Sequence, residues 1–274
     1  MSALMVVKRS GELEPYSEEK VIHSMNRVNV PPELQPQVLS HVRQQFRGEY
    51  LSTDDLFKEV FDFLRHTDKK ASLRLNLRRA IQELGPTGFP FERYLARIFQ
   101  DQGYKTTVDA HLMGECVMHE VDIILEKDGK RDIVEVKFHN DLVGKTDLHV
   151  AMYTYARYLD LKNKHAINDV WVITNTKLTQ DAISYAECKK MKSLGWNYPT
   201  KAHLQHFVEA PKMYPITVLT DFTNMEKARL IEDNIVLCRD LLELKESEIN
   251  SFPLVKKSHL INAIKSARLL LGSS

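Results

Sequence analysis

Cysteine is scarce in this chain, as are long apolar runs and any excess of one charge. Three cysteines are spread over 274 residues, an odd number without a Cys-x-x-Cys pair, so we expect neither a disulfide framework nor a thiolate zinc site. No apolar stretch approaches the roughly 18 residues of a membrane helix, and the N-terminus lacks a signal-peptide core. These absences predict a cytoplasmic protein without a membrane partner.

The charges nearly cancel, with 38 Lys and Arg against 37 Asp and Glu. A balance of +1 excludes a general nucleic-acid coat, so any contact with nucleic acid has to come from a local patch or a metal site. The chain is long enough for one large domain or two ordinary ones, each with its own core.

The first part of the chain predicts a short β-hairpin followed by helices. The expected elements are strands over residues 5–9 and 12–15, and helices from 17, over 34–46, from 52 and over 71–84. Ser17 and Ser52 are predicted to be helix N-caps, because serine is favoured at that position and acidic residues occupy the turn that follows each of them. Gly85-Pro86 ends the last helix and indicates a domain boundary near residue 86.

The pattern beyond this boundary becomes mixed. The expected elements are a helix ending near 103, strands over 104–112, 119–127 and 130–138, a helix over 146–161, a strand over 169–174 and a helix beyond 179. This order predicts a fold of the α/β (α+β) class. We expect three domains, 1–86, 87–197 and 198–274, the last a mainly helical extension that either contacts DNA, dimerises or caps the structure.

Asp128-Gly129, between two alternating runs, predicts a two-residue hairpin turn. Such a turn pairs Lys127 with Lys130, and the same register sets Asp122 opposite Glu135 and Glu120 opposite Lys137. One face of the hairpin is apolar and is assigned to the core: Val121, Ile123, Leu125, Val134, Val136 and Phe138. The other face carries Asp122, Glu135 and Lys137.

Two opposed carboxylates lie about 5 Å apart at Cβ and repel each other. A divalent cation such as Mg²⁺ relieves that repulsion, because it prefers oxygen ligands. The alternative is an exposed polar face of the sheet without any ligand. The residue types and their spacing leave both interpretations open.

Asp122 followed by Glu135-Val136-Lys137, after a helix and two strands, resembles the bipartite motif of the PD-(D/E)XK nuclease superfamily, in its restriction-endonuclease-like, Mrr-type branch. The resemblance implies that Asp122 and Glu135 bind Mg²⁺ or Mn²⁺ with the help of the Val136 carbonyl. It also implies that Lys137 positions or activates the attacking water, and that Glu92 in the preceding helix adds a further catalytic carboxyl group.

The N-terminal run Val6-Val7-Lys8-Arg9-Ser10-Gly11, followed by Tyr16 and Glu19-Lys20-Val21, resembles an ATP-cone, a regulatory nucleotide-binding domain. The resemblance implies that ATP or dATP binds without hydrolysis. The implied contacts are Val6, Lys8, Arg9, Glu14, Ser17, Lys20, Val21 and Thr53. Phe57 stands where this family can have a histidine, and a solvated basic hairpin is the alternative interpretation of these residues.

Gly144-Lys145-Thr146 is similar to the end of a phosphate-binding P-loop, but His139 stands where its first glycine is required. We therefore expect no P-loop here. We expect Lys145 and Thr146 to cap the following helix, near substrate phosphate.

Together the two resemblances predict a nucleotide-regulated, Mg²⁺-dependent DNA endonuclease of the restriction, defence or repair type. Its partners would be DNA and an adenine nucleotide, and a homo-oligomer is expected because cutting both strands takes two active sites. Two alternatives stay open: a non-cleaving, ATP- or dATP-sensing DNA-binding regulator, and a structure-selective resolving nuclease.

Overall fold

The computed structural model describes residues 4–46, 50–245 and 252–272, which pack into two compact units. The first unit contains the residues up to Arg78, Val218–Glu226 and those from Leu244 onward. The second contains Arg79–Thr217 and Lys227–Glu243. Residues 198–274 thus contribute to both units, and the division into domains 1–86, 87–197 and 198–274 stays a prediction.

The first unit is built on a three-stranded sheet with the order β2-β1-β3, in which β1 is antiparallel to β2 and parallel to β3. Its strands are β1 (Met5–Val7), β2 (Leu13–Pro15) and β3 (Tyr50–Ser52). Its helices include α1 (Glu18–Arg27), α2 (Gln35–Gln45), α3 (Thr53–Thr67), α4 (Lys69–Leu75) and α13 (Lys257–Leu271). The caps expected at Ser17 and Ser52 are confirmed, since each side chain accepts a hydrogen bond from the backbone N–H three residues later.

Two features of this region differ from the sequence-based expectation. The helix expected over 71–84 begins earlier, after the N-cap Asp68, and is divided into α4 and α5 (Leu77–Gln82) at the buried Asn76, which is the C-cap of α4. Strand β3 was not expected, since three residues are too few to show a period. It pairs with β1 only through the tertiary fold.

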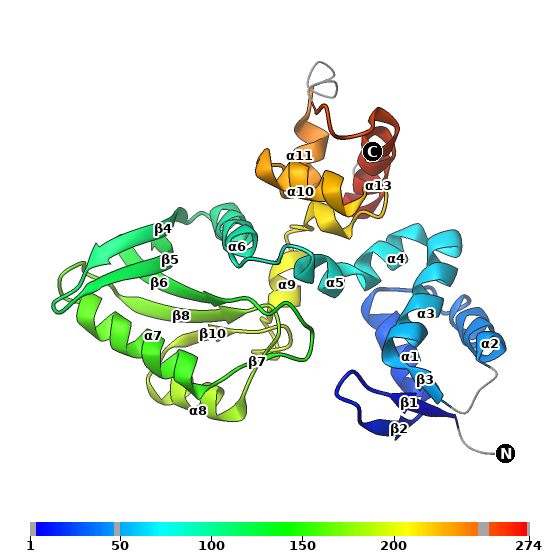
Figure 1. Ribbon diagram of the computed structural model, residues 1–274, viewed down its shortest axis with the longest axis horizontal. Helices are drawn as coiled ribbons and strands as arrows, with labels where there is room; N and C mark the ends of the chain where they lie inside the picture. Colours follow the sequence, from blue (N-terminus) through cyan, green and yellow to red (C-terminus); the bar gives the residue numbers. More distant parts are fainter. Residues whose placement is uncertain (1–3, 47–49, 246–251, 273–274) are drawn as a thin grey trace. The chain divides into compact units, whose positions relative to one another are not determined.

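The second unit contains a five-stranded sheet with the order β10-β8-β6-β5-β4, which confirms the α/β (α+β) class (Figure 1). Its strands are β4 (Lys105–Met113), β5 (Met118–Lys127), β6 (Lys130–Lys137), β8 (Asp169–Thr174) and β10 (Lys192–Leu194). Strands β4 to β6 form an antiparallel meander, whereas β6, β8 and β10 are parallel. Helices α7 (Leu148–Leu161) and α8 (Gln180–Cys188) cover one face, and α6 (Phe89–Asp101) covers the other.

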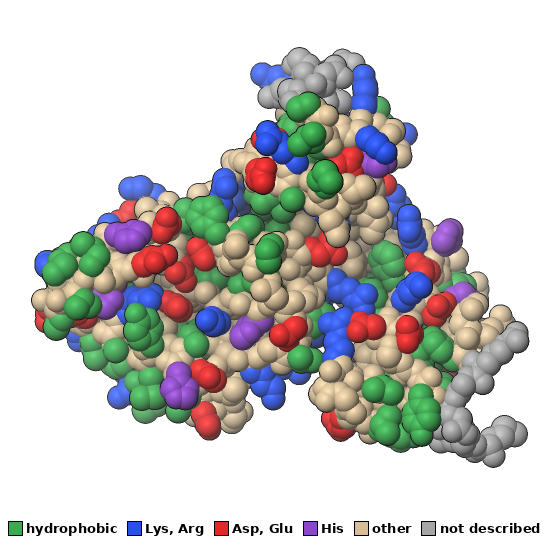
Figure 2. Space-filling view, in the orientation of Figure 1, with side chains coloured by type: hydrophobic (Ala, Val, Ile, Leu, Met, Phe, Trp, Pro, Cys, Tyr) green, Lys and Arg blue, Asp and Glu red, His purple; other side chains and the backbone are tan. Residues whose placement is uncertain are grey.

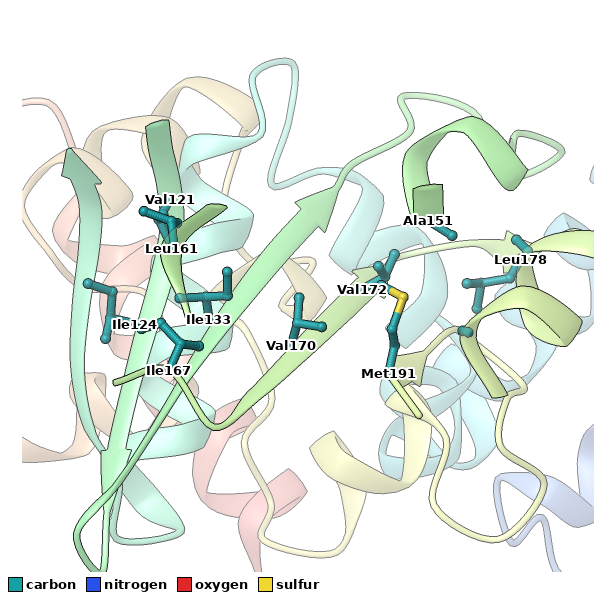
Figure 3. Close-up of a cluster of buried hydrophobic side chains, with 12 residues drawn as sticks. Val121, Ile124, Ile133, Ala151, Leu161, Ile167, Val170, Val172, Leu178 and Met191 are labelled. Carbon is teal, nitrogen blue, oxygen red and sulfur yellow. The ribbon is translucent and has the colours of Figure 1, made fainter. Parts of the chain in front are cut away.

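Both faces of the sheet are buried at its centre, along β6, β8 and the half of β5 near the turn, so the expectation of one core face and one polar face is wrong for much of the hairpin. Ile124 and Ile133, on the face expected to be polar, are 4% and 2% exposed. Figure 3 shows both in the cluster that packs against α7 and α8. On the opposite face Phe99 of α6 meets Trp171 of β8 edge-on. Crossover helices bury parallel strands on both sides, which strand alternation alone does not reveal.

The alternation within β5 is also interrupted. Val121 was assigned to the same face as Ile123, but it lies in the cluster with Ile124. The ladder between β4 and β5 pairs Val108 with Ile123 and Ala110 with Val121, and skips the position between them. There Asp109 has a left-handed φ of 52°. This local irregularity shifts which side chains of β5 face the helices.

The remaining elements of the described chain are short. They are the two-stranded parallel sheet of β7 (Lys145–Thr146) and β9 (Lys177–Leu178), and α9 (Leu204–Glu209), η1 (Ile216–Val218), α10 (Asn224–Glu232) and α11 (Cys238–Glu243). Helix α7 begins later than expected because Asp147 caps it, accepting bonds from His149 and Val150 N–H. The sequence-based expectation that Lys145 and Thr146 cap this helix is therefore wrong, because these two residues form β7. None of the helices in the described ranges has the length and apolar character needed to cross a bilayer.

Candidate active site

The hairpin of β5 and β6 has the register expected from its turn. Its ladder runs from Lys127 opposite Lys130 to Ile123 opposite Val134, and both turn residues, Asp128 and Gly129, have positive φ. The ladder ends there, one position before the two predicted metal ligands. The candidate site therefore begins where β5 and β6 stop pairing.

Asp122 lies at this end of the ladder. Its Oδ2 accepts a hydrogen bond of 2.6 Å from the backbone N–H of Val136, which ties the two strands together after regular pairing has stopped. Burial raises the pKa of Asp122 to about 6, and the negative charge of Glu135 adds to the rise. The Val136 N–H and the cationic Arg157 oppose it. Asp122 is thus a crowded carboxyl group that titrates near neutrality.

Glu135 faces α7. Its Cα partner in β8 is Val172, a residue of the cluster beneath α7. Its carboxylate forms an ion pair with the guanidinium of Arg157, which α7 carries. The two side chains are 17% and 10% exposed, so this pair is largely withdrawn from solvent.

Lys137 lies two residues beyond Glu135, on the same face of β6, with Thr174 as its Cα partner in β8. It is exposed, and within the described ranges it forms no hydrogen bond or ion pair. Its ammonium group is therefore available to a ligand at the mouth of the site.

Glu92 comes to the same place from α6. Burial raises the pKa of Glu92 to about 7, and the charges of four other carboxylates add to the rise. In decreasing order these are Asp122, Glu120, Asp109 and Glu135. Figure 2 shows acidic side chains gathered on the visible face of this unit, over β4 and β5. The structure thus brings three of the predicted site residues, Glu92, Asp122 and Glu135, into one field of negative charge.

Sequence reasoning missed three members of this neighbourhood. Asp109 and Glu120 are exposed carboxylates that it did not assign to the site, and Arg157 lies in a helix among apolar and aromatic residues. Asp109 could have been noticed as the charged residue at the centre of an alternating strand. Nothing in the sequence points to Arg157, because only the packing of α7 on the sheet brings it to Glu135.

The donor atoms of this site fit a hard cation. Asp122, Glu135 and the carbonyl of Val136 supply oxygen, which Mg²⁺ prefers, and Mg²⁺ commonly retains several waters beside one or two carboxylates. Within the described ranges no three His, Cys, Asp or Glu side chains are close enough to hold a metal by themselves. The set of two carboxylates and a carbonyl stays a prediction, and a dication would offset the crowding around Asp122.

The predicted nucleotide residues lie in the first unit, around a cavity of about 270 Å³. Six of them line it: Val6, Glu14, Ser17, Lys20, Val21 and Thr53. Tyr16 and Phe57, which the ATP-cone resemblance also singled out, line it as well, whereas Ser24, Leu56, Val60 and Leu75 were not expected there. Lys8 and Arg9 do not line the cavity and pair instead with acidic neighbours, Lys8 with Glu14 and Arg9 with Asp54.

The raised pKa values predict a stability that depends on pH. Folded Asp122 and Glu92 keep protons that the unfolded chain has released, so the metal-free protein loses stability as pH rises from about 4 through 7. Asp122→Asn removes the repelling charge and keeps the acceptor for Val136. It should stabilise the protein at pH 8 by about 1–2 kcal/mol, after allowance for solvent screening, and have little effect at pH 4.

Thermal unfolding in EDTA at both pH values measures this effect. Glu126→Gln is the matched control, because Glu126 lies on the same strand between Lys105 and Arg131, and its neutralisation should bring no gain. A D122N protein that melts below the parent at pH 8 would contradict the proposed crowding.

Comparison with known proteins matches two segments of the chain to family models. Residues 85–194 match a family described as "Restriction endonuclease", and residues 214–270 match one described as "AF1548-like, C-terminal". Neither model reaches the segment before residue 85, so the ATP-cone resemblance of that segment stays a prediction.

A sequence relative and a solved structure show which family the chain belongs to. An uncharacterized protein from Archaeoglobus fulgidus is 38% identical over 180 residues, which span 65% of this chain and all of the relative. The crystal structure of a protein of unknown function, AF1548, is 34% identical, covers 69% of this chain and 100% of its own, and superposes with a TM-score of 0.59. The chain therefore belongs to the AF1548-like family, with a restriction endonuclease-like domain at residues 85–194 followed by the AF1548-like C-terminal region.

Proposed function

We propose that this protein is a Mg²⁺-dependent DNA endonuclease that hydrolyses phosphodiester bonds. The observation that carries the proposal is the convergence of Glu92, Asp122 and Glu135 where β5 and β6 stop pairing, with the exposed Lys137 on the same strand as Glu135. The match of residues 85–194 to a restriction endonuclease family supports it.

Each residue has a role in this proposal. Asp122, Glu135 and the Val136 carbonyl would hold Mg²⁺, which as a Lewis acid offsets charge on the phosphate and makes water a better nucleophile. Lys137 would orient the attacking water and stabilise negative charge on the phosphate oxygens. Glu92, whose pKa is about 7, would accept or hold a proton at physiological pH.

A pair of lysines near the carboxyl ends of β6 and β8 supports DNA as the substrate. Lys145 of β7 and Lys177 of β9 are direct Cα partners, and both are exposed. Like charges set opposite each other repel, and within the described ranges neither lysine has an acidic partner. A phosphate of the DNA backbone would bridge them and remove the repulsion.

Hydrogen bonds connect these lysines to the candidate active site. His139, two residues after Lys137, exchanges two bonds with Asn175, His139 N–H to Oδ1 at 2.8 Å and Nδ2–H to the His139 carbonyl at 2.9 Å. Its ring nitrogen lies 3.1 Å from the hydroxyl of Thr146, which follows Lys145. The network ties Thr146, the neighbour of Lys145, to the segment that follows Lys137, which supports a phosphate-positioning surface beside the site.

A second function, nucleotide sensing, is supported by the cavity in the first unit. Six of the eight residues implied by the ATP-cone resemblance surround one cavity, and Phe57 occupies its wall where a histidine was possible. We infer that ATP or dATP binds there as a regulatory ligand.

We also infer that the nuclease acts as a homo-oligomer, because two active sites are needed to cut the two strands of DNA.

Cleavage of supercoiled and linear DNA tests the main proposal. Asp122→Asn and Lys137→Gln should each lower Mg²⁺-dependent cleavage at least a hundredfold, since each removes a group that acts on the reacting atoms. Lys130→Gln, at the other end of the same hairpin, is the control and should leave cleavage unchanged. EDTA should abolish cleavage, and Mg²⁺ or Mn²⁺ should restore it.

Full cleavage by D122N would refute the assignment. A wild-type protein that binds DNA but never nicks it, with either metal and with or without ATP, would favour the non-cleaving regulator.

The lysine pair predicts the salt dependence of DNA binding. The double variant K145Q/K177Q should bind DNA more weakly than the parent. Each lost phosphate contact lowers the magnitude of the slope of log affinity against log salt by about 0.9, so the loss of one or two contacts should lower it by about one to two. K130Q/K201Q removes two exposed lysines of the same unit and should keep the parental slope. Equal slopes for the two double variants would contradict the phosphate role.

The cavity predicts binding of adenine nucleotides. Lys20→Glu should weaken ATP and dATP binding at least tenfold in calorimetry, because a carboxylate would replace the ammonium group at the cavity wall. Lys58→Glu, an exposed lysine of α3 that does not line the cavity, is the matched control. Absence of heat with either nucleotide in the wild type would remove nucleotide sensing and leave the nuclease proposal intact.

A further inference from the structure

Arg157 is an unusual residue for its position. Its side chain is 10% exposed, comes from α7 and forms an ion pair with Glu135, one of the proposed metal ligands. Its charge also acts on Asp122. The guanidinium of Arg157 is thus placed on the carboxylate that Mg²⁺ would need.

The guanidinium of Arg157 is not fully bonded. It can donate five hydrogen bonds, and its Nε is buried without a hydrogen-bond partner among the residues that the structure describes. Burying an unsatisfied donor of a charged group destabilises the folded state. A further hydrogen-bond acceptor that reaches the guanidinium during function would satisfy this donor and remove the cost.

Tyr153 gives the guanidinium a second surface. The carbon centre of the Arg157 head group lies 4.9 Å from the centroid of the Tyr153 ring, one turn earlier on α7, within the range of a cation–π contact. Tyr153 is 59% exposed. The head group is therefore in contact both with a buried carboxylate and with an aromatic ring that opens to solvent.

We propose that Arg157 is a resident counter-cation: it pairs with Glu135 and partly offsets the charge of Asp122 while the metal is absent, and it leaves Glu135 for a DNA phosphate when the metal binds. The inference rests on the proposed nuclease function and deepens it. A dication and a guanidinium compete for the same carboxylate oxygens. A released guanidinium at the mouth of the site matches the planar, bidentate geometry that phosphate accepts.

This role has an unusual signature, because removal of the charge has opposite effects on two ligands. Without Arg157 the dication no longer competes with a guanidinium for the carboxylate of Glu135, so metal binding should tighten. DNA binding in the presence of metal should weaken, because the phosphate loses a donor. A merely structural ion pair that orients Glu135 predicts that metal binding weakens as well.

The experiment uses the full chain and two neutral variants, Arg157→Gln and Arg157→Met, the second keeping a long apolar side chain should the first not fold. Arg131→Gln is the matched control, since Arg131 lies in the same unit and pairs with Glu126, away from the site. Circular dichroism checks folding. Calorimetry with Mn²⁺ in the absence of DNA measures metal affinity, and fluorescence anisotropy measures DNA affinity in EDTA and in Ca²⁺, which also prefers oxygen ligands.

The expected result is Mn²⁺ binding at least about tenfold tighter in a folded neutral variant, with the control unchanged. DNA affinity should fall about tenfold in Ca²⁺ and stay the same in EDTA, where Arg157 remains on Glu135. Unchanged or weaker Mn²⁺ binding in a folded neutral variant would overturn the proposal for Arg157.

Failure of this inference can be told apart from failure of the nuclease proposal. If the wild type binds Mn²⁺ and cleaves DNA but the neutral variants bind metal like the parent, only the role of Arg157 is refuted. If the wild type neither binds metal nor cleaves, the proposed function fails, and the role of Arg157 fails with it.

Discussion

Negative charge gathered where β5 and β6 part is the constraint on which the second unit depends. Burial and mutual repulsion raise the pKa of Asp122 to about 6 and that of Glu92 to about 7. A protein selected for stability alone would disperse these groups or replace them. The sheet retains them at a point where regular pairing stops and the Val136 N–H can hold Asp122 in place. The instability is local, and a cationic ligand would remove it.

The surrounding fold makes this concentration of charge tolerable. Helices pack apolar side chains against both faces of the sheet, so the acidic groups at the end of the β5–β6 ladder are held by a well-packed structure. The same helices also deliver side chains to the site, Glu92 from α6 and Arg157 from α7. Helices α6 and α7 therefore both stabilise the sheet and supply side chains to the site. The packing of α7 on the sheet places the positive charge of Arg157 beside Glu135.

Much of the local structure could be predicted because its causes are local. Asp128-Gly129 adopts the two positive φ angles of a tight turn, and this sets the register of the hairpin from Lys127 to Ile123. Ser17 and Ser52 cap helices through bonds to residues three positions later. The face assignment failed for Val121 and Ile124, because a period of two does not reveal a skipped pair at Asp109 or helices packed on both faces.

By itself the sequence determined the turn, the three consecutive strands β4, β5 and β6, the helix caps and the identity of the acidic and basic groups in the motif, since these follow from neighbours within a few residues. Only the tertiary structure decided that Glu92 shares the field of Asp122, that Lys145 faces Lys177, and that Arg157 covers Glu135. These interactions are between residues that lie far apart in the chain. They depend on how helices and parallel strands pack, which no short-range pattern encodes.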